Sequence, residues 1–242
     1  MSPTLITLSA SAAAALTAAL GVLPLAGREE VPETWIGWAN ALAGGMMFGT
    51  AFALGVVEGE QAVPAALGAL GGILFIAWTH AATGTESLEL NQLDEDEPAY
   101  GYRVALVQTL HAGSEGLAIG AAMAVSLSFG LFTAATMAVH NIPEATVLAA
   151  VQRGRGTRLP AAALMAVAVN MPQVFVAVST FAVVRAAPGL QSWALGLGTG
   201  MLANLVLVEL LPESYRQAGH TSIAVVTSAA LAMVVLLNAW AL

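Results

Sequence analysis

The sequence is poor in charge and contains no cysteine. Only 9% of its 242 residues are charged, whereas soluble domains carry about 25%. Hydrophobic residues make up 58% of the chain. A soluble fold would leave large apolar surfaces in water, so a lipid bilayer is the expected solvent. The absence of cysteine excludes a disulfide framework and a thiolate metal site.

Lysine is also absent, and all seven basic residues are arginine. The formal net charge of −8 argues against nucleic acid as a partner, because binding it requires a basic face. No basic segment precedes the first apolar stretch. We therefore expect this stretch to remain as a membrane helix rather than to be cleaved as a signal peptide.

Apolar runs separated by short breaks predict an all-α bundle of eight transmembrane helices in a single domain. Crossing a bilayer takes about 20 apolar residues, and eight such runs account for most of the chain. One break is long: residues 86–102 are acidic and contain Pro98, which is typical of a flexible loop. The predicted spans cover residues 4–26, 34–57, 62–85, 103–126, 128–151, 159–184, 191–212 and 220–242.

Arginine is distributed unevenly between the two sides of the predicted bundle. Six of the seven arginines fall in odd-numbered loops, and only Arg185 falls in an even-numbered loop. Cytoplasmic loops are enriched in basic residues. We therefore expect the acidic loop 86–102 in the cytoplasm and both termini outside it, in a multi-pass protein of the cell membrane.

A weak internal repeat links the second and seventh predicted spans. Residues 45–58 read GMMFGTAFALGVVE and residues 200–213 read GMLANLVLVELLPE. An offset of five spans reverses the direction through the membrane, so a genuine repeat would be inverted, as in many alternating-access transporters. Chance similarity between two helices rich in glycine and leucine is the alternative interpretation.

Two His-x-x-x-Glu pairs lie in consecutive spans at membrane depth. His111 and Glu115 belong to QTLHAGSEGLAIG, and His140 and Glu144 belong to MAVHNIPEATVLA. The four-residue spacing places both side chains of a pair on one helical face. An ionised side chain at the bilayer centre costs about 3 kcal/mol on insertion scales. One divalent cation bound by all four groups would offset this cost, and imidazole and carboxylate suit Zn²⁺, Cd²⁺, Fe²⁺ and Mn²⁺.

Other interpretations of these residues remain open from the sequence. Each pair could form a self-satisfied ion pair that stabilises the bundle, or the same groups could relay protons in a metal-free solute carrier. An intramembrane zinc hydrolase usually carries His-Glu-x-x-His. Here Ala112 and Asn141 follow the two histidines, which disfavours an enzyme, so we expect a transporter of divalent metal.

The two segments resemble the fourth and fifth helices of the ZIP family of divalent-metal transporters, whose forms are H-N-x-x-E-G-L-A-I-G and H/Q-x-I-P-E/H. The eight spans, the long third loop and the E-L-L-P-E end of span 7 (Glu209 to Glu213) are also similar. The resemblance implies inverted repeats of spans 1–3 and 6–8 around spans 4–5, a homodimer and a bacterial inner membrane. The matching residues are His111, Glu115, Gly116, Leu117, Ala118, Ile119, Gly120, His140, Ile142, Pro143 and Glu144.

The resemblance also implies a metal site at the bundle centre, which holds two metals in bacterial members of the family. At three positions that bind the second metal there, this chain has Ala112, Asn141 and Met171. Nearby Asn170 and Gln173 are polar but uncharged. We therefore expect one transported metal, with a second site that is absent or weak. The implied ligands of the first metal are Met47, His111, Glu115, His140 and Glu144.

Four further polar residues lie toward span ends. Glu209, Glu213 and His220 are expected near the cytoplasmic ends of spans 7 and 8, where they could receive the departing ion. A solvated helix end is the alternative interpretation. His80, near the end of span 3, is expected at the membrane interface. Zinc is the expected substrate, although cadmium, iron and manganese suit the same ligands.

Overall fold

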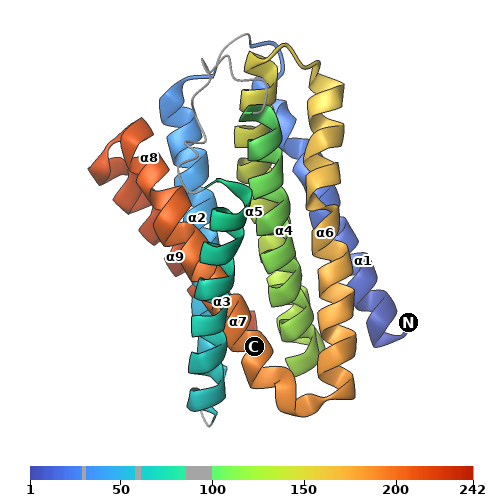
Figure 1. Ribbon diagram of the computed structural model, residues 1–242. Coiled ribbons are helices and arrows are strands. Elements are labelled where there is room, and N and C mark those ends of the chain that lie inside the picture. Colours follow the sequence, from blue (N-terminus) through green and yellow to red (C-terminus); the bar gives the residue numbers. More distant parts are fainter. Residues whose placement is uncertain (29–30, 58–60, 86–99, 242) are drawn as a thin grey trace.

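The computed structural model describes residues 1–28, 31–57, 61–85 and 100–241, and these residues form helices joined by short connections (Figure 1). The prediction of an all-α fold is confirmed for this part of the chain. Residues 86–99, most of the predicted acidic loop, lie outside it, as does Glu58 at the end of the proposed repeat. The elements are α1 (Pro3–Thr17), η1 (Ala18–Leu25), α2 (Glu33–Val56), α3 (Ala62–Thr83), α4 (Tyr100–Val125), α5 (Leu127–Gly154), α6 (Leu159–Ala186), η2 (Pro188–Leu190), α7 (Gln191–Leu205), η3 (Val206–Leu210), α8 (Leu211–Ala218) and α9 (His220–Ala241).

The helices group into eight passes among the described residues, because α1 continues into η1 and α7 continues through η3 into α8. Six of the passes are long and apolar enough to cross a membrane, which supports a multi-pass membrane protein. The other two are α4 and α5, whose polar residues lower their mean hydropathy. By length and composition alone, the prediction of eight membrane spans is thus supported for six.

Several boundaries differ from those predicted by one to three residues, and the end of the seventh pass differs by six. Helix α4 begins at Tyr100 rather than at residue 103, so the last residues of the predicted loop are helical. The seventh pass does not end at residue 212 but continues to Ala218. Pro212 stands just after the π-helical turn η3, at the start of α8. The proline is therefore compatible with a helix that continues past it.

Helices α4 and α5 lie in the middle of the bundle (Figure 1). They pack against each other, α4 also contacts α6 and α7, and α5 also contacts η1, α1 and α2. Glycine allows the closest of these approaches: a Cβ on Gly116 of α4 would lie 2.4 Å from the carbonyl oxygen of Gln173 in α6. Surrounding helices thus cover most of the central pair, although Leu131 and Val139 of α5 remain exposed. The pair carries the polar residues described next.

Candidate metal site

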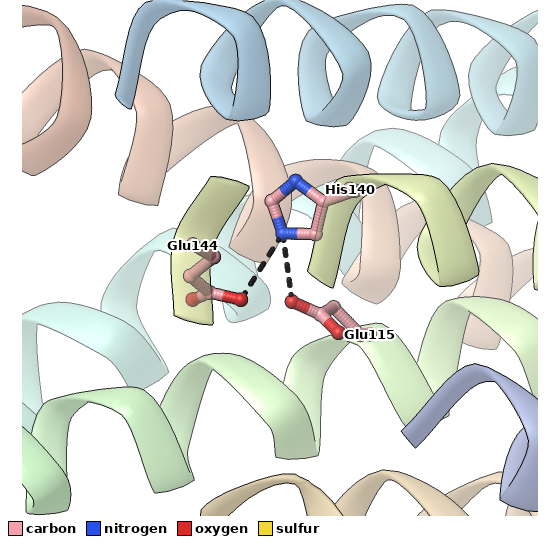
Figure 2. Close-up of side chains that lie close together, drawn as sticks. All are labelled: Glu115, His140 and Glu144. Carbon is pink, nitrogen blue, oxygen red and sulfur yellow. Dashed lines mark hydrogen bonds and ion pairs between the residues drawn. The ribbon is translucent and has the colours of Figure 1, made fainter. Parts of the chain in front are cut away.

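Glu115 of α4 and His140 and Glu144 of α5 converge in the buried centre of the bundle (Figure 2). Their ligand atoms all lie within 4.8 Å of one another. His140 Nε2 is 3.1 Å from Glu115 Oε1 and 3.3 Å from Glu144 Oε2. The two helical faces that carry the His-x-x-x-Glu pairs therefore point toward each other.

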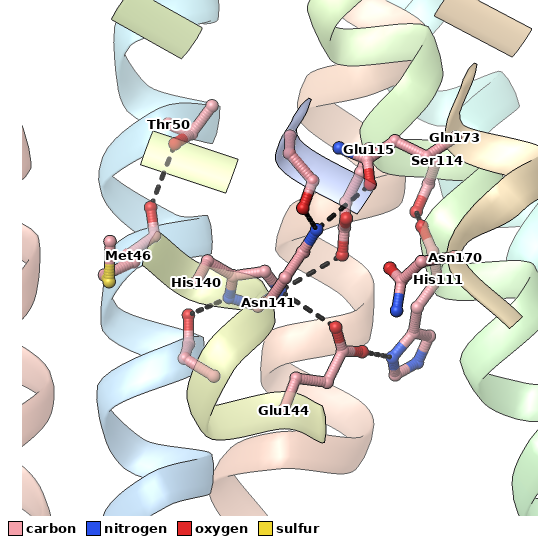
Figure 3. A network of polar contacts seen from close by, with 12 residues as sticks. Met46, Thr50, His111, Ser114, Glu115, His140, Asn141, Glu144, Asn170 and Gln173 are labelled. Atoms are coloured by element: carbon pink, nitrogen blue, oxygen red, sulfur yellow. Dashed lines mark hydrogen bonds and ion pairs between the residues drawn. The ribbon is translucent and has the colours of Figure 1, made fainter. Parts of the chain in front are cut away.

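His111 joins this trio through Glu144. Its Nδ1 lies 3.0 Å from Glu144 Oε1, so the two oxygens of this carboxylate contact two different imidazoles (Figure 3). His111 and His140 are both fully buried. The structure thus brings all four residues of the two predicted pairs into one connected cluster.

The backbone of α2 fixes the orientation of the His140 ring. His140 Nδ1 lies 3.1 Å from the carbonyl oxygen of Ala43. Because a carbonyl oxygen only accepts hydrogen bonds, Nδ1 is the donor and carries the proton. Nε2 is then the ring nitrogen that faces the two carboxylates and is free to bind a cation.

Glu209 belongs to the central cluster, and not to a solvated helix end. It lies in η3, a single π-helical turn, and its Oε2 is 3.1 Å from His111 Nε2. Its Oε1 is 2.6 Å from His80 Nε2, an ion-pair contact without hydrogen-bond geometry. The side chain of His80, expected at the membrane interface, is buried against Glu209, and its depth in the membrane stays a prediction.

Sequence reasoning missed the link between Glu209, His80 and the centre, although a signal was present. Glu209 stands within the apolar run VLVELL, and His80 stands near the end of an apolar span. An ionisable residue in an apolar segment is a functional-site candidate by default. The same criterion that selected the two His-x-x-x-Glu pairs therefore applies to both residues.

Glu213 and His220 make their contacts away from the cluster. The Glu213 carboxylate, although buried, accepts hydrogen bonds from Arg216 and from Gln217, the latter at 2.5 Å. His220 is exposed and stacks on Tyr215 with ring centroids 5.1 Å apart. A role for either residue in ion release stays a prediction.

Three amides lie beside the cluster, where the resemblance would place the second metal (Figure 3). Asn141 Nδ2 donates to Gln173 Oε1 at 3.1 Å and to the Ala14 carbonyl at 2.9 Å. Asn170 Nδ2 donates to its own helix, at the Ala166 carbonyl. These side chains supply dipoles but no charge, whereas a second dication would need carboxylates. The expectation of one metal stays a prediction.

Met47 is fully buried in an apolar cluster that includes Leu54, Ile119 and Met137. Its role as a fifth ligand therefore stays a prediction. Met171, proposed for a weak second site, is partly exposed.

The donor atoms of the cluster fit a divalent cation. In a tetrahedral zinc site with bonds of about 2.0–2.1 Å, neighbouring ligand atoms lie about 3.3 Å apart. Within the converging trio, the two nitrogen–oxygen distances of 3.1 and 3.3 Å are close to this value. Glu115 Oε2 is buried without a hydrogen-bond partner, and a buried carboxylate oxygen is costly unless it binds a donor or a cation.

Comparison with known proteins adds one relative and no family assignment. No family model matches the chain. The chain is similar to a "putative zinc transporter" of Arabidopsis thaliana, with 32% identity over 220 residues. The similar region is 88% of this chain but 35% of the plant protein, so the chain spans about a third of the length of that relative.

Proposed function

We propose that the protein carries divalent metal cations, zinc foremost, across a membrane toward the cytoplasm. The observation that carries the proposal is the convergence of Glu115, His140 and Glu144 at the centre of a membrane bundle. Two carboxylates and neutral imidazoles balance the charge of one dication and supply ligands that zinc prefers. The similarity to a plant protein named as a zinc transporter supports the choice of substrate.

The transported ion binds at a single site. Its ligands are His111, Glu115, His140 and Glu144, and Met47 is a weaker candidate for a fifth. Cadmium, iron and manganese are alternative substrates, because the same ligand types accept them. Selectivity among these ions would follow from geometry and from the supply of metal in the cell.

Access to this site alternates through the movement of two groups of helices, α1, α4, α5 and α6 against α2, α3, α7 and α9. Within each group, glycine allows two backbones to lie in direct contact. A Cβ on Gly72 of α3 would lie 2.3 Å from the Leu197 carbonyl oxygen of α7. A Cβ on Gly116 of α4 would lie 2.4 Å from the Gln173 carbonyl oxygen of α6. Between the groups, a Cβ on Gly198 of α7 would meet the Leu117 side chain at 3.1 Å. Side chains adjust more easily than backbones, so the boundary between the groups is where sliding is easiest.

The packing of the helices supports an inverted repeat of passes 1–3 and 6–8. Such a repeat exchanges pass 1 with 6, 2 with 7, 3 with 8 and 4 with 5. Under this exchange the α3–α7 contact corresponds to the α9–α2 contact. The α4–α6 contact corresponds to the α5–α1 contact. The contact of α2 with α5 likewise becomes that of α7 with α4. All of these contacts occur among the described residues.

The direction of transport and the assembly rest on the sequence. Six arginines lie in or next to the odd-numbered connections, which favours that side as the cytoplasmic one, with both termini outside. Glu213 and His220 lie beyond Glu209 toward that side and would meet the departing ion. A homodimer and a bacterial inner membrane follow from the resemblance to the ZIP family and stay predictions.

Zinc uptake by liposomes tests the proposal. The purified chain is reconstituted around a zinc-sensitive dye, and saturable uptake is expected for the wild type. His111→Ala and His140→Ala should each abolish it. Thr199→Val should not, because among the described residues the Thr199 hydroxyl bonds only the carbonyl oxygens of Ala51 and Leu195. Uptake by both histidine variants at the wild-type rate would refute the proposal.

Metal analysis separates this proposal from its two rivals. A metal-free solute carrier would retain no stoichiometric metal after purification at neutral pH. An intramembrane hydrolase would bind zinc but would not move it into liposomes. The proposed transporter should do both, with about one zinc retained per chain.

A further inference from the structure

The two ring nitrogens of His111 face carboxylates on different helices. Nδ1 lies 3.0 Å from Glu144 Oε1 in α5, and Nε2 lies 3.1 Å from Glu209 Oε2 in η3. We propose that Glu209 is a positioning residue, whose carboxylate holds His111 so that Nδ1 faces the transported metal. This inference rests on the proposed function, because it assigns a role at the same site.

Both ring nitrogens of His111 face carboxylates, which only accept hydrogen bonds, so either nitrogen can carry a proton when no metal is bound. A histidine ligand must offer a lone pair to the metal, and Nδ1 is the nitrogen that points at Glu144 and the centre. With a metal bound at Nδ1, the ring proton would stay on Nε2, where Glu209 accepts it. A histidine ligand that donates its other N–H to a carboxylate is a recurring arrangement, and the carboxylate also makes the ligand nitrogen more basic.

Glu209 is itself anchored on the side away from the centre. Its other oxygen, Oε1, is 2.6 Å from His80 Nε2, and His80 Nδ1 is 2.8 Å from the Thr85 hydroxyl. The chain of contacts thus runs from Thr85 through His80 and Glu209 to His111. Glu209 lies in the single π-helical turn of the seventh pass, and such turns occur often at functional sites.

His140 shows the same arrangement with a weaker acceptor. Its Nδ1 donates to the carbonyl oxygen of Ala43, which leaves Nε2 for the metal. The two imidazoles therefore present different nitrogens, Nδ1 in His111 and Nε2 in His140. Of the two histidines, only His111 has a charged partner, Glu209, on its far side. Removal of the Glu209 carboxylate should therefore weaken metal binding more than the loss of a neutral acceptor would.

The geometry separates this role from that of a ligand. Among the described residues, the group of converging ligand atoms contains Glu115, His140 and Glu144, and His111 and Glu209 both lie outside it. Glu209 contacts His111 at Nε2, on the opposite side of the ring from Glu144. In this arrangement Glu209 acts on the ion through His111.

Binding of Co²⁺ to the purified full-length chain tests the inference, because its visible absorption reports both affinity and ligand set. Glu209→Ala should weaken binding by about 10- to 100-fold, while the spectrum at saturation stays that of the wild type. Glu209→Gln should lose less, because its amide oxygen can still accept from Nε2–H. Thr199→Val, in the same pass, is the matched control and should bind as the wild type does.

A double-mutant cycle decides whether Glu209 acts through His111. Combined with His111→Ala, the Glu209→Ala change should cause no further loss of affinity. An equal loss in both backgrounds, or an altered spectrum at saturation in Glu209→Gln, would overturn the inference. If instead the wild type binds no Co²⁺, or His111→Ala binds as the wild type does, the proposed function fails and the positioning role fails with it.

Discussion

Replacing Gly116 by alanine should disturb the candidate metal site without changing a proposed ligand. The added Cβ would lie 2.4 Å from the carbonyl oxygen of Gln173 and 2.9 Å from its Cα. Ordinary contacts of this kind begin at 3.4 Å, so α4 and α6 must separate by about 1 Å, and neither backbone can yield as a side chain would. Overpacking of this kind costs about 1–3 kcal/mol.

The separation of α4 from α6 should displace Glu115, because Glu115 directly precedes Gly116 in α4. Metal ligands tolerate displacements of only about 0.2 Å, so a shift several times larger should weaken binding. We expect Gly116→Ala to lower Co²⁺ affinity at least about 10-fold, which corresponds to about 1.4 kcal/mol. It should also lower the midpoint of thermal unfolding measured by tryptophan fluorescence.

Gly113→Ala is the matched control in the same helix. A Cβ at Gly113 would meet nothing within 4 Å, and alanine has the higher helix propensity of the two residues. Its metal affinity and thermal midpoint should therefore equal or exceed those of the wild type. If Gly116→Ala matched Gly113→Ala in both measurements, the claim that the α4–α6 contact sets the geometry of the site would be refuted.

Three further predictions follow from the cluster. Glu144→Gln should abolish zinc uptake, because this carboxylate contacts both imidazoles; residual saturable uptake above one tenth of the wild-type rate would contradict its central role. The wild type should bind about one zinc per chain by metal analysis, and the combined change Ala112→Asn, Asn141→Asp and Met171→Glu should raise this to two; two zinc ions in the wild type would show that the neutral amides suffice. Zinc at 100 times its Kd should stabilise the chain by about 2.7 kcal/mol, so chelation should lower the thermal midpoint of the wild type but not of His140→Ala.

The sequence was sufficient for the helices and for the two central pairs. Apolar runs mark membrane helices because the bilayer fixes their length, and the predicted ends differ from the observed ones by a few residues at most positions. The spacing of His111 with Glu115, and of His140 with Glu144, is local information. Helical geometry converts it directly into a shared face, and the contact between α4 and α5 then brings the two faces together.

Contacts between segments far apart in the sequence could not be predicted from local spacing. Glu209 and His111 are 98 residues apart, and a π-helical turn directs the carboxylate inward. No local sequence pattern predicts a π-helical turn, and the neighbouring Pro212 and Glu213 suggested the end of a helix instead. The contact of His80 with Glu209 was missed for the same reason, because its partner comes from another pass.

The polarity of α4 and α5 is linked to the position of the site, because the same residues make these helices polar and form the site. These helices are absent from the six that are apolar enough to cross a membrane by composition, yet they lie in the middle of the bundle. A helix that carries His111 and Glu115, or His140 and Glu144, can be accommodated there because its neighbours bury these side chains. The apolar helices around the pair therefore provide the medium in which an ion-binding centre can exist. A metal ion at that centre would in turn supply the charge that makes the buried carboxylates tolerable.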